Sequence, residues 1–345
     1  MIENHFTDTT MKKILIPVLF VSVFAAGMSC SRWTEPEALE FPHVTPGQED
    51  PGAYAAYLSR LRAYKQSDHK IMIADFVATG EEPAFQRDHL SSLPDSVDYI
   101  CVAHPEKMTE TLVKEMNAIL KDKGTQTLAI VDYMAIQNDW DAMLADLADS
   151  GETDLPGDDA FQTYCRERTK AMIDSCDEFG FAGIVVAFKG TTSSSGQQTF
   201  MEEVSSWRQK HRNRVMLLHG FVQNILPDYR FLIADSRFII LWTSSYNTAG
   251  GLTSYVAGRI EADVPADRFI VETAYPALDN PTQTGIAMSV AAQWVTEEDP
   301  RFTKAGLYVS NARDDYFNAE HIYQTIRAAI RTMNTAPANE VQAEE

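Results

Sequence analysis

Cysteine, cationic side chains and long apolar stretches are all scarce in this chain of 345 residues, and each scarcity excludes a class of protein. Of four cysteines, Cys101, Cys165 and Cys176 follow Cys30, and an odd set cannot complete a disulfide framework. Cys165 and Cys176 fall on one expected helix, about 16 Å apart by helical rise, which is beyond disulfide reach. We expect all three to be buried apolar side chains.

Positive charge is equally sparse, with 29 Lys plus Arg against 49 Asp plus Glu and a formal net charge of −20. Such a surface repels phosphate backbones, so nucleic acid is not an expected partner. The histidines are scattered and no His, Asp and Glu group has ligand-like spacing, so neither a metal nor another cofactor is expected. The composition therefore leaves glycans, small molecules and proteins as candidate ligands.

The apolar run Ile14–Ala26 follows the basic residues Lys12 and Lys13, and it is too short to span a membrane stably. Gly27-Met28-Ser29-Cys30 comes next and resembles the lipobox of bacterial lipoproteins, with Gly27 where an aliphatic residue is usual. We predict a signal peptide over residues 1–29, with Met11 as the true start, lipidation of Cys30, and a tether over 30–50. An ordinary secretory signal is the alternative, and either reading predicts export.

Between residues 51 and 334, short β-branched runs alternate with amphipathic stretches, and a disordered tail is expected over 335–345. The expected strands are Lys70–Ala78, Val97–Ala103, Thr127–Tyr133, Gly180–Phe188, Arg214–Phe221, Arg237–Thr243, Arg268–Tyr275 and Gly306–Ala312. The expected helices are Glu106–Lys123, Ala160–Phe179, Gln197–Arg212, Thr282–Glu298 and Asn318–Met333, with at most short turns after the first and fifth strands.

Regular alternation of strand and helix predicts a parallel sheet with right-handed crossovers. An open doubly wound sheet would carry a Gly-rich phosphate turn after its first strand, which ADFVATGEEP is not. Eight successive units favour the closed alternative, an α/β single domain folded as a (β/α)8 TIM barrel. Functional side chains of such barrels lie at the carboxyl ends of the strands.

The fourth strand carries the most specific pattern. Glycoside hydrolase family 18 has a motif of the form F-D-G-x-D-x-D-x-E at this place, and residues 181–189 read FAGIVVAFK. The frame of Phe181, Gly183 and Phe188 resembles that motif. Every acidic position differs: the aspartate positions hold Ala182, Val185 and Ala187, and the glutamate position holds Lys189.

The resemblance implies a mechanism that these residues cannot perform. In that family the Glu donates a proton to the leaving oxygen, the substrate's N-acetyl group attacks the anomeric carbon, and an Asp orients this acetamido group. Lys189 is a far weaker acid, and its charge opposes a cationic transition state. Losing the positioned acid alone costs about a hundred- to ten-thousand-fold. Period-two alternation predicts that positions 185, 187 and 189 point into the barrel and its mouth.

Two further strands extend the comparison with the family. A substrate-binding Tyr often ends the sixth strand, and Tyr246 is its counterpart in a shifted register. The eighth strand usually supplies a Trp as the floor of the sugar site. Here Ser310 is the nearest equivalent, so the floor is absent or is supplied by Tyr308.

Three hypotheses follow. The first is a non-catalytic lipoprotein that binds a GlcNAc-containing glycan, a degenerate relative of the chitinases and endo-β-N-acetylglucosaminidases, through aromatic and planar polar side chains. The candidate contacts are Asp132, Tyr133, Lys189, Gln223, Trp242, Tyr246, Tyr275, Asn311 and Arg313. Lys189 is expected to pair with Asp132 or Glu272.

The second hypothesis is an active glycoside hydrolase with relocated carboxylates, for which Asp75, Asp132 and Glu272 are the candidates. The third is a protein-interaction module of an outer-membrane glycan-uptake system. The resemblance to lipoproteins of glycan-foraging Gram-negative bacteria also implies a place in the cell envelope, with the protein anchored to the outer membrane by its N-terminal lipid.

Overall fold

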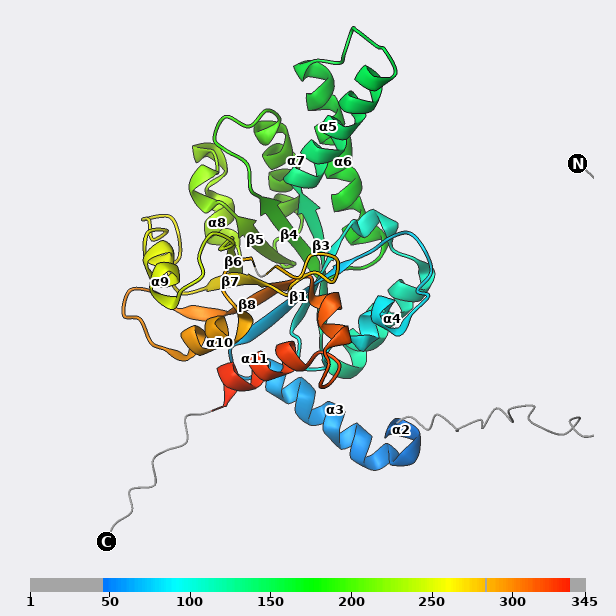
Figure 1. The fold of residues 1–345 in the computed structure, drawn as a ribbon, viewed down its shortest axis with the longest axis vertical. Helices are drawn as coiled ribbons and strands as arrows, with labels where there is room; N and C mark the ends of the chain where they lie inside the picture. The colour runs from blue at the N-terminus through cyan, green and yellow to red at the C-terminus, as the bar shows by residue number, and fades with distance from the viewer. Residues whose placement is uncertain (1–45, 283, 336–345) are drawn as a thin grey trace, which may run out of the picture. The chain divides into compact units, whose positions relative to one another are not determined.

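The computed structural model describes residues 46–282 and 284–335. Eight parallel strands follow one another around a closed barrel, in which each strand pairs with the next and β8 pairs with β1 (Figure 1). The strands are β1 (Ile71–Val77), β2 (Tyr99–Ala103), β3 (Gln126–Asp132), β4 (Gly183–Phe188), β5 (Val215–Gly220), β6 (Phe238–Leu241), β7 (Phe269–Ala274) and β8 (Lys304–Ser310). The predicted (β/α)8 barrel is confirmed, and the open sheet is wrong.

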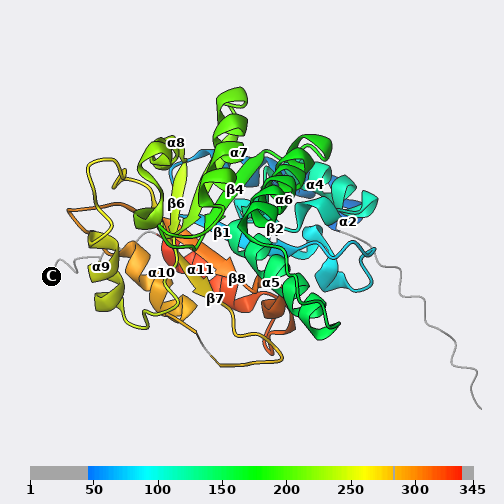
Figure 2. The same ribbon diagram turned by 90° about the horizontal axis from the view of Figure 1, so that it is seen from above.

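Helices surround the strands in both views (Figures 1 and 2). They are α3 (Pro51–Gln66), α4 (Glu110–Lys123), α5 (Tyr133–Asp149), α6 (Asp158–Glu178), α7 (Gln197–Lys210), α8 (Phe231–Asp235), α9 (Ala249–Ala257), α10 (Met288–Thr296) and α11 (Gln324–Asn334). The segments after β1 and β5 hold the short turns that were expected, η1 (Gln86–Asp88) and η2 (Leu90–Ser92), then η4 (Val222–Asn224), η5 (Pro227–Tyr229) and the short α8. Two more 3-10 turns, η3 (Pro105–Lys107) and η6 (Ala312–Phe317), follow β2 and β8.

Among the helices around the barrel, α3, α5 and α9 were not predicted. The strand expected to reach Tyr133 ends at Asp132, whose side chain accepts the backbone N–H of Met134 at 2.8 Å and so caps α5. Gly124 ends α4 with a positive φ of 74°, a conformation that favours glycine. The strand expected from Gly180 begins at Gly183, because Gly180 itself takes a turn conformation with a φ of 78°.

The signal peptide, Cys30, most of the tether and the tail from residue 336 lie outside the described residues. Within the predicted tether, Pro46–Glu49 forms a short helix, α2. None of the helices in the described part of the chain is long and apolar enough to cross a membrane.

Period-two alternation in β4 divides its side chains between two clusters. Val185 and Ala187 belong to the cluster inside the barrel. Ile184, Val186 and Phe188 belong to the larger cluster between the strands and the helices. A strand covered on both faces explains why β4 is an uninterrupted apolar run, and the predicted inward direction of positions 185 and 187 is confirmed.

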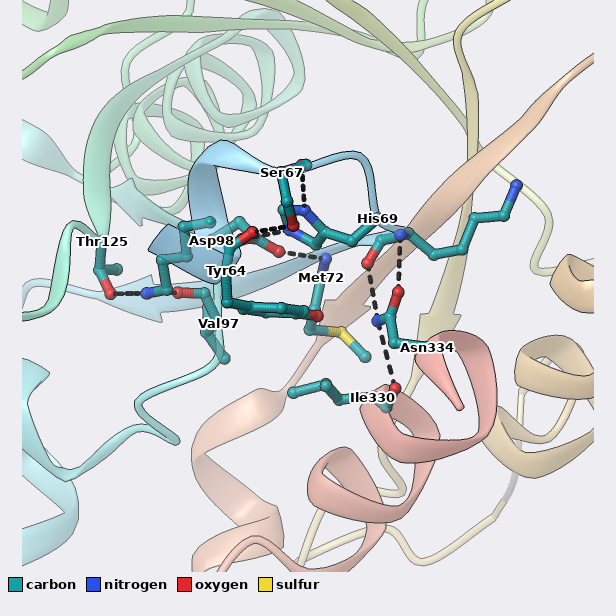
Figure 3. A network of polar contacts seen from close by, with 11 residues as sticks. Tyr64, Ser67, His69, Met72, Val97, Asp98, Thr125, Ile330 and Asn334 are labelled. Atoms are coloured by element: carbon teal, nitrogen blue, oxygen red, sulfur yellow. Dashed lines mark hydrogen bonds and ion pairs between the residues drawn. The ribbon is translucent and has the colours of Figure 1, made fainter. Parts of the chain in front are cut away.

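A polar network lies at the amino-terminal end of the barrel (Figure 3). Asp98 pairs with Nε2 of His69 at 2.9 Å, and this hydrogen bond raises the pKa of His69. Asp98 also accepts the backbone N–H of Met72 at 2.8 Å. Asn334, at the end of α11, accepts the N–H of Lys70 at 2.7 Å and donates to its carbonyl at 3.0 Å. Since barrel chemistry resides at the other end, we assign this network to stability.

Candidate functional site

The carboxyl end of the barrel gathers charged side chains around Glu272, which projects from β7. His219 from β5 places Nε2 2.9 Å from Oε2 of Glu272, and Lys189, just after β4, places Nζ 3.7 Å from the same oxygen. Ser310, at the end of β8, donates its hydroxyl to Oε1 at 3.0 Å. Glu272 therefore connects three other strands, and its expected pairing with Lys189 is confirmed.

The electrostatics of Glu272 follow from these contacts. Burial alone would raise its pKa, but the charges of His219 and Lys189 and the hydrogen bonds from His219 and Ser310 outweigh burial and lower the pKa to about 2. The carboxylate is thus held as an anion in the physiological range. A carboxyl of this kind accepts hydrogen bonds but is a poor proton donor.

Lys189 also contacts an aromatic face. Its ammonium nitrogen lies 5.1 Å from the ring centroid of Trp242, within the range of a cation–π interaction. Phe221 packs edge-on against the same indole, with ring centroids 5.0 Å apart. Lys189 therefore sits between a carboxylate and an indole at the place where the family motif carries its glutamate.

A cavity of about 260 Å³ opens beside these groups and is called the mouth cavity below. Its walls combine an indole, a carboxylate, hydroxyls, an amide and backbone; the lining residues are Trp242, Ser244, Glu272, Ala274, Thr284, Gly285, Ser310 and Asn311. The volume is slightly below the range of about 300–1,000 Å³ for drug-sized ligands. A single sugar residue is the matching scale of ligand.

The other two candidate carboxylates, Asp75 and Asp132, accept hydrogen bonds from backbone N–H groups. Asp75, at the inner face of β1, accepts the N–H groups of Asn311 and Ala312 at 3.0 and 2.9 Å and so fixes the start of η6. Burial raises its pKa to about 6 against these two donors, and the nearby charge of Glu272 adds to the rise. Asp132 caps α5.

Seven of the nine predicted glycan contacts do not line the mouth cavity, among them Asp132, which caps α5. Tyr133 is buried against Phe188 and Phe200, because it begins α5 instead of ending β3. Four more have other surroundings: Tyr246 stacks on Tyr255, Tyr275 packs on the core, Arg313 pairs with Asp88, and Oε1 of Gln223 is buried with no hydrogen-bond partner in the described structure. Of the predicted contacts, Trp242 and Asn311 line the cavity, and Lys189 borders it through Trp242 and Glu272.

Most of the chain matches the model of a known family. Residues 34–332 match the family model described as glycoside hydrolase family 18, BT1044-like. The chain belongs to glycoside hydrolase family 18. Comparison with curated proteins gives no match.

Solved structures of family 18 enzymes superpose on the barrel. A selenomethionine form of BT1044 with a Glu-to-Gln substitution gives a TM-score of 0.57 at 14% identity, over 84% of this chain and 95% of the other. An endo-β-N-acetylglucosaminidase from Cordyceps militaris gives 0.56 at 15% identity, over 81% and 96%. A family 18 chitinase from Pseudoalteromonas aurantia gives 0.53 at 8% identity, over 76% and 99%. At these identities the superpositions show a shared fold alone.

Within family 18, the glycine of the strand motif has a packing role here. A Cβ on Gly183 would lie 1.8 Å from the carbonyl oxygen of Val215 on β5, so only glycine fits this position. The apolar replacements Val185 and Ala187 fill the barrel interior. The frame of the motif therefore maintains the barrel independently of the acids.

Sequence reasoning placed Ser310 at the floor position of the sugar site but missed that His219 and Ser310 both bind Glu272. Alternation along β5 and β8 already turned both side chains inward. The sequence did not reveal the strand register, which places the side chains of His219, Glu272 and Ser310 at the same level along the barrel axis. Tyr308, predicted as an alternative floor of the sugar site, does not line the cavity. It is buried inside the barrel, where the centroid of its ring lies 4.7 Å from that of the His219 ring.

Proposed function

We propose that this family 18 barrel binds a GlcNAc-containing glycan at the mouth cavity without hydrolysing it. The observation that carries the proposal is the state of the carboxyl groups beside an open, indole-lined cavity. Asp75 and Asp132 accept backbone N–H groups, and Glu272 is paired with Lys189 and His219. The cavity can therefore offer stacking and hydrogen bonds, whereas the carboxyl that lines it, Glu272, is a poor proton donor.

The side chains around the cavity match the chemistry of a sugar. The Trp242 indole offers an apolar face for the C–H surface of a pyranose ring. Glu272 can accept hydrogen bonds from hydroxyl or amide N–H groups, and Asn311 can both donate and accept them. One solved structure with this fold, an endo-β-N-acetylglucosaminidase variant from Cordyceps militaris, holds fucosyl-N-acetylglucosamine-Asn, which is a ligand of the same class.

Calorimetric titration with GlcNAc, chitobiose and a free N-linked oligosaccharide tests binding, while mass spectrometry follows hydrolysis in the same samples. We expect binding without cleavage, loss of binding in Trp242→Ala, and retained binding in Trp242→Phe, which keeps an aromatic face. Phe231→Ala, an exposed phenylalanine on α8, is the matched control. Absence of binding for every sugar would refute the proposal.

A hydrolase with relocated acids is the second candidate, and one observation favours it: the pKa of Asp75, raised to about 6, is in the range of a general acid. Cleavage that disappears in Asp75→Asn would establish this alternative and refute the proposal that the barrel binds glycans without hydrolysing them. A third role, as an interaction module of a glycan-uptake assembly, would be supported only if sugars fail to bind.

We also propose an N-terminal lipid anchor in the cell envelope of a Gram-negative bacterium, on the outer membrane. The support is the sequence Gly27-Met28-Ser29-Cys30 after the apolar run. Radiolabelled palmitate should label the wild-type protein and not Cys30→Ala.

A further inference from the structure

A cavity of about 830 Å³ opens at the amino-terminal end of the barrel and is called the basal cavity below. Residues at or next to the first position of four strands border it, namely Ile71, Gln126, Phe238 and Ala305. Ser67, His69 and Asn334 of the network in Figure 3 also line it. Its volume lies in the range of about 300–1,000 Å³ for small-molecule sites, and none of these residues lines the mouth cavity.

Positive charge gathers around the basal cavity, although the chain as a whole has a net charge of −20. The charged side chains that line it are Lys65, His69, Lys70, Arg237, Asp68 and Asp267. Asp267 pairs with Arg268 at 2.7 Å, and His69 pairs with Asp98 at 2.9 Å. Within residues 46–282 and 284–335, neither lysine nor Arg237 forms an ion pair, so three cations face one carboxylate that is not paired. An anionic ligand would compensate this excess.

Two of these cations have hydrogen-bond donors that the protein does not use. Nζ of Lys70 donates to the carbonyl of Lys304 at 2.9 Å, which occupies one of its three protons. The guanidinium group of Arg237 makes no hydrogen bond in the described part of the chain, and its carbon lies 5.8 Å from the centroid of the Phe238 ring. Lys70 and Arg237 can therefore both donate to a ligand in the cavity.

Arg237 interacts across the base of the barrel. Burial raises the pKa of Tyr99, a residue of β2, and the positive charge of Arg237 opposes this rise. The rings of Tyr99 and Phe238, the residue that follows Arg237, have centroids 6.2 Å apart. Since β2 and β6 lie on opposite sides of the eight-stranded barrel, these interactions place the guanidinium group toward the barrel axis.

Gln126 contributes a polar group that has no partner. Leu128 and Ile130 of β3 belong to the cluster inside the barrel, so Gln126, two positions before Leu128, also faces inward. Its Oε1 atom is buried and has no hydrogen-bond partner among the described residues. A buried acceptor of this kind costs free energy unless a donor reaches it, and a hydroxyl group of a ligand is such a donor.

We propose that the basal cavity binds a phosphate monoester that carries hydroxyl groups, with its phosphate on Arg237 and Lys70 and a hydroxyl group on Gln126. A phosphate monoester carries about −1.5 to −2 charges at pH 7, which matches the excess of cations better than one carboxylate does. The Phe238 ring offers an apolar face to the carbon atoms of the ligand. A soluble phosphate ester and a lipid headgroup that ends in a phosphate share this chemistry. The inference does not rest on the proposed function, because the mouth cavity lies at the other end of the barrel.

Calorimetric titration of the full chain with glycerol 3-phosphate, inorganic phosphate and glycerol tests the soluble source. Sedimentation with phosphatidylcholine vesicles, with and without phosphatidylinositol 4-phosphate, tests the lipid source. We expect glycerol 3-phosphate to bind, inorganic phosphate to bind more weakly and glycerol not to bind. Arg237→Gln should weaken the binding of glycerol 3-phosphate about ten- to hundredfold, the range of hydrogen bonds to a charged group. Gln126→Leu should weaken it about two- to tenfold and leave the binding of inorganic phosphate unchanged.

Lys107→Gln is the matched control for Arg237→Gln. Lys107 is an exposed residue of η3, which follows β2 at the other end of the barrel, and its replacement changes the net charge by the same amount. Phosphate binding in this variant should equal that of the wild-type protein. Melting temperatures verify that each variant is folded.

The two arms of the test assign the source of the ligand. If glycerol 3-phosphate binds through Arg237, the site is supported for a soluble ester. If only the vesicles with phosphatidylinositol 4-phosphate bind, and Arg237→Gln abolishes this binding, the site is supported for a lipid headgroup. Absence of binding for every phosphate probe would refute the site, and so would equal losses in Arg237→Gln and Lys107→Gln, since binding would then follow net charge alone. Neither refutation would affect glycan binding at the mouth cavity.

Discussion

Replacing Glu272 by Gln removes the anion that Lys189 and His219 share while keeping the size of the side chain. The pKa of Glu272 falls from an ordinary value of 4.5 to about 2 in the folded protein. Since a tenfold change in proton affinity corresponds to about 1.4 kcal/mol, the ionised carboxylate contributes about 3 kcal/mol to the free energy of unfolding. Its side chain is 11% exposed, so solvent screens this contribution little.

The sign of the pH dependence follows from the lowered pKa. The contribution is complete above about pH 5 and is lost as the pH falls from about 4.5 toward 2. About 2 kcal/mol of it should be gone at pH 3. The stability difference between the wild-type protein and Glu272→Gln should therefore be about 3 kcal/mol at pH 7 and about 1 kcal/mol at pH 3.

Urea denaturation followed by circular dichroism at both pH values measures this difference. Glu110→Gln is the matched control, because Glu110 pairs with Lys114 on the exposed face of α4 and its loss should leave stability unchanged. A wild-type-to-variant difference that is the same at pH 7 and pH 3 would refute the assignment of Glu272 as the charged centre of the mouth.

Three other changes have equally definite outcomes. Gly183→Ala should give insoluble protein, because the new Cβ would lie 1.8 Å from the carbonyl oxygen of Val215. Gly250→Ala, on α9 with open space around the new Cβ, should fold, and its free energy of unfolding should rise by up to about 1 kcal/mol. Soluble yield and thermal melting distinguish the two variants. Lys189→Glu should not hydrolyse a chromogenic chitobioside, since the aspartate positions remain apolar; activity above background would contradict this. Asp98→Asn should lower the free energy of unfolding by about 1–3 kcal/mol in urea titrations without changing glycan affinity.

The barrel was predictable because its strands are short, apolar on both faces and regularly spaced. The helix α5 was missed although its sequence carries a signal, with Asp132 as N-cap and the buried residues Tyr133, Ile136 and Trp140 at helical spacing. Those same residues continue an apolar strand, so the end of β3 was placed one residue late. Tyr133 then appeared among the glycan contacts, where burial excludes it.

The candidate site was only partly predictable, since it depends on contacts between distant strands. The missing acids of β4 and the pairing of Lys189 with Glu272 followed from local sequence and inward alternation. His219 contributes to the same cluster from 53 positions before Glu272 in the chain. The register between β5 and β7 that joins them is fixed by the closure of the whole barrel, which local patterns do not encode.

The position of α11 has a practical consequence. Its last residue, Asn334, which Figure 3 shows, is hydrogen-bonded to Lys70 just before β1. Trp242 and Glu272 line the mouth cavity at the other end of the barrel. An affinity handle joined after this helix would fix the protein to a sensor chip with its mouth toward the flowing sample. Under the proposed function the barrel would serve as an oriented glycan-capture reagent, and a handle inserted in the loop after β7, which contributes Thr284 and Gly285 to the mouth cavity, would obstruct it.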